Sequence, residues 1–220
     1  MKIAISGTQC IGKTTLINDM LQQWPNYELD TNCYRKKIKD EGLIINKDGD
    51  EKNQIIIRDA LIDQVAARKR TEKVLFDRCI FDNLAYSMWL CAKSKVSPLF
   101  LQQQIQIIRE SFSLYDVIFF IPMSEAYPVE LTERENRDID SVFRLEIDNI
   151  MKALIQTYHD NTGRYFPKEN CPAIIEIFGS PVERIAMLKL YLQENGDVYG
   201  EEDSIMVADT SGPVKPVKLY

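Results

Sequence analysis

The chain has 220 residues, of which 45% are hydrophobic and 27% charged, and its net charge is -6. These values are ordinary for one soluble globular domain, and the negative charge argues against a generic, charge-driven nucleic-acid binder, although not against a local basic cleft. The five cysteines are scattered without a C-x-x-C pair, which argues against a metal site or a disulfide framework and favours a reducing, cytoplasmic setting. We expect no signal peptide and no membrane partner, because every apolar run is too short to span a bilayer.

The most specific motif lies near the start of the chain. Residues 7–14 read GTQCIGKT, the G-x-x-x-x-G-K-T pattern of a phosphate-binding loop. The apolar run at 2–6 predicts a buried strand before the loop, and apolar residues at helical spacing from Leu16 to Trp24 predict a helix after it, which Pro25 ends. Because strand, glycine loop and helix are the setting that the motif requires, a chance match is the less favoured reading.

The chemistry of such a loop indicates what its residues do. Backbone N–H groups face an anion, so we expect the phosphates of ATP to contact Gly7, Thr8, Gln9, Cys10, Ile11, Gly12, Lys13, Thr14 and Thr15. Lys13 is expected to reach the outer phosphates, and the Thr14 hydroxyl to ligate the Mg²⁺ that accompanies ATP.

A second short strand is expected at residues 27–30. In open α/β sheets, ligands bind at the carboxyl ends of the strands, so Asp30, Asn32 and Arg35 are candidates for contacting the acceptor. The lysines that follow Arg35 fit a solvated helix face and a basic cleft equally well.

A third buried strand is predicted at residues 73–76, ending in Asp77 and Arg78. A carboxylate at this place is suited to Mg²⁺ binding or catalysis, and an arginine beside it offers a planar fork to a phosphate; a surface ion pair is the less favoured alternative. In the helix that follows, we expect Tyr86 to line the acceptor pocket, while Asp82 either lines it too or only favours the helix N-terminus.

The remaining elements follow from apolar periodicity. We expect a polar loop at 46–52, helices at 53–72 and 99–112, a strand at 115–122, a long helix with an apolar stripe from Phe143 to Tyr158, a strand at 173–178, and a helix at 181–192 capped by Ser180.

Two further segments are candidates for the site. The charged stretch at 128–144 predicts a lid in which Arg134, Arg137 and Arg144 neutralise the transferring group, the alternative being a salt-bridged helix start. The loop after the fifth strand is expected near the nucleotide base, through Gly179, Pro181 and Arg184.

The end of the chain differs in composition. Glycine and proline recur after Asn195, which predicts a folded domain at 1–194 and a flexible tail at 195–220. The single histidine, His159, is assigned no role.

With these residues in place, the chain resembles the P-loop nucleoside and nucleotide kinases, in particular the thymidylate-kinase-like group and the ATPase-type kinases related to ribosylnicotinamide kinase. The resemblance runs from residue 1 to about 193 and rests on four stretches: GTQCIGKT from Gly7, DRCIFDNLAY from Asp77, ENRDIDSVFRLEID from Glu135 and FGSPVER from Phe178. It implies an α/β P-loop NTPase fold, a three-layer sandwich around a five-stranded parallel sheet with strand order 2-3-1-4-5, an arginine-bearing lid and, as in many relatives, a homodimer.

The resemblance also implies roles by position. The catalytic residues would be Lys13, Asp77, Arg78 and Arg137, and the ligands of Mg²⁺ would be Thr14 and Asp77. Arg78 and Arg35 would face the acceptor, for which Asp30, Asn32, Asp82, Tyr86 and Arg134 are further candidate contacts. The sequence departs from many relatives at Asn32, where they carry a glutamate.

Three functions stay open from the sequence. The first is Mg²⁺- and ATP-dependent phosphoryl transfer to a nucleoside monophosphate, which the number of arginines favours. The second is transfer to a hydroxyl of a nucleoside, of nicotinamide riboside or of a hydroxymethylated base in DNA, which needs a carboxylate base. The third, of another class, is a nucleotide-dependent switch that regulates a protein partner.

Overall fold

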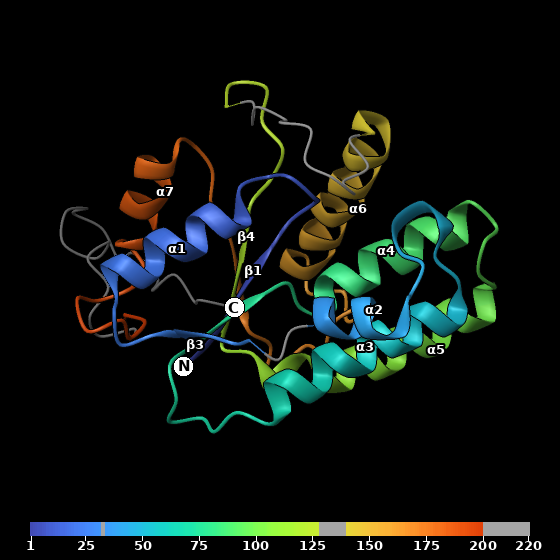
Figure 1. Ribbon diagram of the computed structural model, residues 1–220, viewed down its shortest axis with the longest axis horizontal. Helices are drawn as coiled ribbons and strands as arrows, with labels where there is room; N and C mark the ends of the chain where they lie inside the picture. The colour runs from blue at the N-terminus through green and yellow to red at the C-terminus, as the bar shows by residue number, and fades with distance from the viewer. Residues whose placement is uncertain (32–33, 128–139, 200–220) are drawn as a thin grey trace.

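The computed structural model describes residues 1–31, 34–127 and 140–199 (Figure 1). Five parallel strands form one sheet in the order β2-β3-β1-β4-β5. The strands are β1 (Lys2–Ser6), β2 (Glu28–Leu29), β3 (Val74–Asp77), β4 (Val117–Phe120) and β5 (Ala173–Glu176). This order confirms the predicted fold class.

Helices connect consecutive strands and cover both faces of the sheet. The α-helices are α1 (Lys13–Gln23), α2 (Tyr34–Glu41), α3 (Glu51–Ala66), α4 (Ile80–Ala92), α5 (Pro98–Ser111), α6 (Ser141–His159) and α7 (Pro181–Leu188). Two short 3-10 turns, η1 (Asn46–Asp48) and η2 (Phe112–Leu114), lie in the connections.

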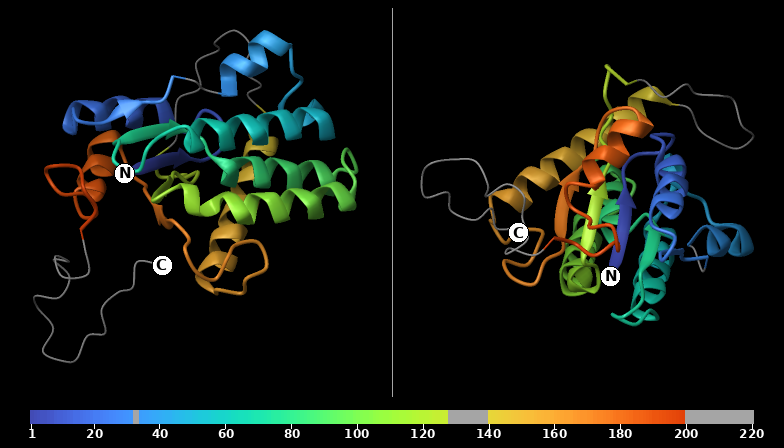
Figure 2. Two further views of the ribbon diagram at one scale, coloured as in Figure 1. Left: turned by 90° about the horizontal axis from the view of Figure 1, so that it is seen from below. Right: turned by 90° about the vertical axis from the view of Figure 1, so that its left-hand side faces the viewer.

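Helices lie on both faces of the sheet (Figures 1 and 2), and the buried side chains form two hydrophobic cores, one on each face. Helices α1 and α7 pack on one face with Ile3 and Ile5, whereas α3, α4, α5 and α6 pack on the other face with Ala4. Successive side chains of a strand point to opposite faces, so a strand that is apolar at every position serves both cores. The three-layer sandwich follows from this pattern.

Two helices end several residues before their predicted bounds. α3 begins at Glu51, because the Asp50 side chain accepts from the N–H of Asn53, and it ends at Ala66 rather than at residue 72. The charged residues after Ala66 turn back toward β2, where Arg68 pairs with acidic side chains. α7 ends at Leu188 rather than at residue 192, because Leu192 forms an antiparallel bridge with Val198.

The segment 193–199 packs against the corner between α1 and β2. The Trp24 Nε1–H donates to the carbonyl of Gln193 at 2.8 Å, and the Tyr27 hydroxyl donates to the carbonyl of Gly196 at 2.6 Å. Within the described residues, the segment after Gln193 therefore packs against the domain predicted at 1–194. The rest of the predicted tail lies outside the described residues.

In the part of the chain that the structure describes, no helix has the length and apolar character that crossing a membrane requires.

Candidate nucleotide-binding site

The predicted phosphate-binding loop connects the carboxyl end of β1 to the first turn of α1. Positive φ angles recur along it, at Gly7 (141°), Cys10 (55°) and Gly12 (91°). A Cβ at Gly7 would lie 2.7 Å from the carbonyl oxygen of Ile121, so only glycine fits at this position. Where left-handed and right-handed backbone angles alternate, successive N–H groups point toward one concave side. A backbone loop binds an anion in this way.

Lys13 is folded into this loop. Its side chain is buried, and its ammonium donates to the carbonyls of Gly7 at 2.9 Å and Thr8 at 2.6 Å. Thr14 and Thr15 follow in the first turn of α1 and are exposed. The lysine charge thus lies at the loop, and the two hydroxyl-bearing residues face solvent beside it.

Asp77 and Arg78 lie next to the loop, because β3 pairs with β1 in a register that sets Asp77 opposite Ile5. Arg78 has a φ of 80°, and its N–H donates to the carbonyl of Ile5 at 3.0 Å. Its guanidinium donates to the Gly7 carbonyl at 3.1 Å and lies over the ring of Tyr86, 5.3 Å from the ring centroid. A left-handed non-glycine residue beside a ligand loop is a common mark of a functional site.

Asp82 is buried between the loop and α4. Its carboxylate accepts from the N–H of Gly7 at 3.3 Å, from Arg78 at 2.8 Å and from the N–H of Cys79 at 3.1 Å. It therefore caps the N-terminus of α4, one of its two predicted roles, and it also joins the phosphate loop to Arg78. Burial raises the pKa of the neighbouring Cys79 thiol, so this cysteine stays protonated.

Two more arginines reach the loop, and sequence reasoning gave both of them other roles. The Nε–H of Arg144, expected as a lid residue, donates to the carbonyl of Gln9 at 2.9 Å, and its NH2 group donates to that of Cys10 at 3.1 Å. Arg184, expected at the base, donates to the carbonyl of Ile11 at 3.1 Å. Their side chains are only 5% and 6% exposed. The sequence could have indicated that Arg144 is buried, because this residue lies within the apolar stripe of α6.

The loop between β5 and α7 lies beside Arg184. Gly179 has a φ of 97°, Pro181 is the first residue of α7, and the Ser180 hydroxyl accepts from the N–H of Glu183 to cap the helix. Phe178 and Val182 are 52% and 80% exposed. The predicted base loop therefore presents apolar surface near the phosphate loop.

The acceptor residues predicted after β2 are only partly described. The buried carboxylate of Asp30 accepts from Arg68 at 3.1 and 2.7 Å, an ion pair that fastens β2 to the segment after α3. This pair does not bring Asp30 to the phosphate loop. Asn32, Arg134, Arg137 and the side chain of Arg35 lie outside the described residues.

Among the described residues, no three histidine, cysteine, aspartate or glutamate side chains form a group that could hold an ion. A site made of Thr14 and Asp77 would need oxygen atoms from nucleotide phosphates to complete the coordination of Mg²⁺.

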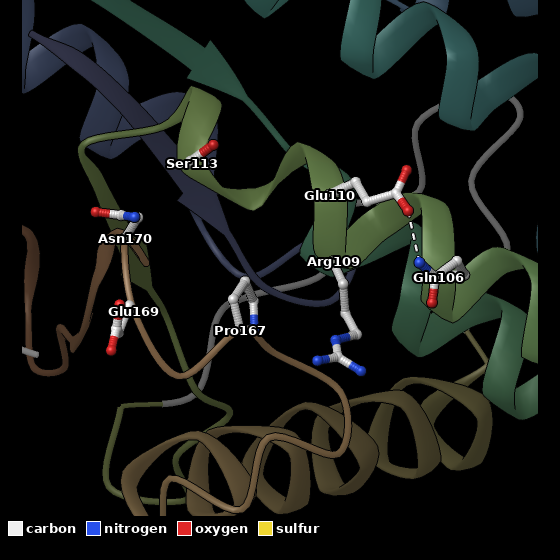
Figure 3. Close-up of a pocket in the computed structure, with 7 residues that line it drawn as sticks. All are labelled: Gln106, Arg109, Glu110, Ser113, Pro167, Glu169 and Asn170. Carbon is white, nitrogen blue, oxygen red and sulfur yellow. Dashed lines mark hydrogen bonds between the residues drawn. The ribbon is translucent and has the colours of Figure 1, made fainter.

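One cavity lies at the opposite edge of the sheet, before the amino ends of β4 and β5 (Figure 3). Its volume is about 360 Å³, and it is lined by Gln106, Arg109, Glu110, Ser113, Pro167, Glu169 and Asn170. The cavity is thus separate from the phosphate loop, which follows the carboxyl end of β1.

Comparison with known proteins places the chain in a family. The sequence profile of a family described as an AAA domain matches residues 2–162. The chain belongs to this AAA-domain family. The match includes the phosphate loop, Asp77, Arg78 and Arg144 of the AAA domain, and it ends before the loop between β5 and α7. A search of curated protein sequences finds no match.

Solved structures share the fold of this AAA domain. A NadR protein in complex with NR aligns over 90% of the chain and 53% of its own length, with a TM-score of 0.61 and 12% identity. A deoxyadenosine kinase from M. mycoides, with products dCMP and a flexible dCDP bound, aligns over 86% of the chain and 96% of its own, with a TM-score of 0.56 and 17% identity. The chain spans about half the length of the NadR structures, at 53% and 48%. The AAA domain therefore has the fold of P-loop nucleoside and nucleotide kinases, as its sequence predicted.

Proposed function

We propose that this protein transfers the γ-phosphoryl group of ATP to a nucleoside or nucleotide. The observation that carries the proposal is the position of Arg78, whose guanidinium donates to Gly7 of the phosphate loop while its backbone follows Asp77. The phosphate loop, which would bind the phosphoryl donor, and the residues Asp77 and Arg78 at the end of the neighbouring strand lie at the same edge of the sheet. Phosphoryl transfer needs such an arrangement, because catalysis depends on positioning and charge neutralisation.

On the donor side, the loop holds the phosphates and Lys13 supplies a point charge to the outer ones. Breaking its contacts with the carbonyls of Gly7 and Thr8 frees the ammonium to follow the ligand. Thr14 and Asp77 would hold Mg²⁺, which supplies Lewis-acid neutralisation of charge on the phosphate oxygens when it is bound. The exposed side chains of Phe178 and Val182 offer an apolar surface for the base, because small-molecule sites are lined mostly by apolar side chains.

On the acceptor side, Arg78 and Tyr86 form the floor of the site. The acceptor proposed first is a nucleoside monophosphate, because a guanidinium fork matches a phosphate dianion. Arg35, Arg134 and Arg137 would add positive charge to this side.

A second candidate is a hydroxyl acceptor, and one observation favours it. The sequence predicted Arg144 as a lid arginine, but its guanidinium donates to carbonyls of the loop. Less positive charge is therefore left to bind an acceptor phosphate. Asp77 would then be the base that receives the hydroxyl proton. The deoxyadenosine kinase that shares the fold is consistent with this chemistry. A polymer acceptor would use the exposed lysines of α2, of which Lys36 and Lys39 are examples.

The test is an ADP-release assay with ATP and Mg²⁺ over a panel of nucleosides, nucleoside monophosphates and hydroxymethylated DNA. Stimulation by a monophosphate supports the first acceptor, and stimulation by a nucleoside or by DNA supports the second. Slow hydrolysis that no acceptor stimulates, but that a protein partner does, would replace both by a nucleotide-dependent switch.

A further inference from the structure

Two buried arginines approach the phosphate loop from opposite faces of the sheet. Arg144 comes from the first turn of α6, in the core that contains α3, α4 and α5, whereas Arg184 comes from α7, in the core that contains α1. Arg144 binds the carbonyls of Gln9 and Cys10, and Arg184 binds that of Ile11. Three consecutive carbonyls of the loop are therefore held by guanidinium groups.

Holding a carbonyl also fixes an N–H group. Across a planar trans peptide, the carbonyl of one residue and the N–H of the next point in opposite directions. With the three carbonyls directed at the arginines, the N–H groups of Cys10, Ile11 and Gly12 are directed away from them. These are backbone donors of the kind that a phosphate-binding loop offers to its anion.

We propose that Arg144 and Arg184 are positioning residues, which fix the direction of these N–H groups and so set the affinity of the loop for polyphosphate. The inference rests on the donor site of the proposed function. It also changes the role of Arg144 from neutralising a transferring phosphoryl group to supporting the loop that holds the donor.

The chemistry of the arginine side chain fits this role. A planar fork with several N–H donors spans two neighbouring carbonyls, as Arg144 does, whereas a lysine ammonium is a single point. The fit at Arg184 is close, since a Cβ on Gly12 would lie 2.8 Å from its NH1 group. Burial lowers the pKa of Arg184, because the charged guanidinium is removed from water. A bound polyphosphate would stabilise this cation.

The experiment compares Arg144→Met and Arg184→Met with the wild-type chain. Titration calorimetry measures the dissociation constants of ATP and of inorganic tripolyphosphate well below the melting temperature. Each variant is expected to weaken both ligands by the same factor, about tenfold for each arginine. Arg109→Met is the matched control, because Arg109 is a partly buried helical arginine that lines the cavity at the opposite edge of the sheet, and it is expected to bind both ligands as the wild type does (Figure 3).

A conservative variant separates charge from geometry. Arg144→Lys keeps the charge and cannot span two carbonyls, so it is expected to lose most of the affinity that Arg144→Met loses. Wild-type affinity in Arg144→Lys would overturn the positioning role.

Other outcomes are equally decisive. A lower melting temperature with unchanged dissociation constants would make the arginines merely structural, and a loss of kcat at unchanged affinity would return Arg144 to the transferring group. If the wild type binds both ligands but phosphorylates no acceptor, the proposed function fails and this inference stands. If it binds neither ligand, both fail.

Discussion

The donor and acceptor sides of the site are built differently. On the donor side, the loop carbonyls from Gly7 to Ile11 accept hydrogen bonds from Lys13, Arg78, Arg144 and Arg184. On the acceptor side, β2 has two residues and α2 is largely exposed. Under the proposed function, the polyphosphate would therefore be bound by a backbone loop held in a fixed shape, while the acceptor would be bound by a few side chains at the sheet edge.

The largest effect is expected when the charge inside the loop is removed. Lys13→Ala is expected to lower kcat by roughly a hundredfold or more, because a preorganised cation at a transferring phosphoryl group contributes that much. Steady-state ADP release measures the effect, and circular dichroism checks that the fold persists. A kcat close to that of the wild type would refute the donor assignment.

The acceptor side is tested by Arg78→Ala. The expected result is a higher KM for the acceptor or a kcat lower by roughly a hundredfold, with a smaller rise in the dissociation constant of ATP, because the Arg78 guanidinium lies over the ring of Tyr86 and also donates to the Gly7 carbonyl of the loop. Arg164→Ala, an exposed arginine that stacks on its neighbour Tyr165, is the control. Weaker ATP binding with an unchanged acceptor KM would mean that the two sides are exchanged.

The role of Asp30 is the next test of the comparison. Asp30→Asn weakens a largely buried ion pair with Arg68 and is expected to cost about 2 kcal/mol of unfolding free energy, with the acceptor KM unchanged. Urea denaturation measures the first quantity and initial rates measure the second. A raised KM at unchanged stability would instead place Asp30 on the acceptor.

The smallest effect is expected at the base loop. Ser180→Ala removes the N-cap of α7 and is expected to cost about 1 kcal/mol of unfolding free energy, because the N–H of Glu183 loses its acceptor. Thermal denaturation measures the change, and Ser113→Ala, an exposed serine at the opposite edge of the sheet, serves as control.

The same cap predicts a dependence on pH. Hydrogen bonds from Ser180 lower the pKa of Glu183, so the capping box stabilises the fold above the ordinary pKa of glutamate. That contribution is lost as the pH falls through the lowered pKa. The difference between wild type and Ser180→Ala is therefore expected to shrink in acid, and an unchanged difference would contradict the role of the carboxylate.

Much of the fold was predictable because it is encoded locally. The strands are short apolar runs, the phosphate loop is a contiguous motif, and the strand order follows from the family pattern that GTQCIGKT and DRCIFDNLAY carry. The cap of α7 at Ser180 was also predictable, since a hydroxyl before a proline and a glutamate marks a helix start.

The errors come from contacts between distant segments. The early end of α3 depends on Arg68 finding Glu28 and Asp30, and the docking of 193–199 depends on Trp24 and Tyr27. The contacts of Arg144 were not predictable for the same reason: a basic residue beside a charged stretch is typical of a lid, and only the packing of α6 against the loop shows which carbonyls it binds. Sequence spacing carries no information about such partners.

Arg144 and Arg184 also connect the loop to the helical layers on both faces of the sheet. Because Arg144 is on α6, which packs in one hydrophobic core, and Arg184 is on α7, which packs in the other, helices from both faces of the sheet are hydrogen-bonded to the same loop. A ligand that locks the loop therefore opposes the separation of either helical layer from the sheet. Under the proposed function, nucleotide binding would therefore link the two halves of the sandwich, and the free energy of binding would stabilise both.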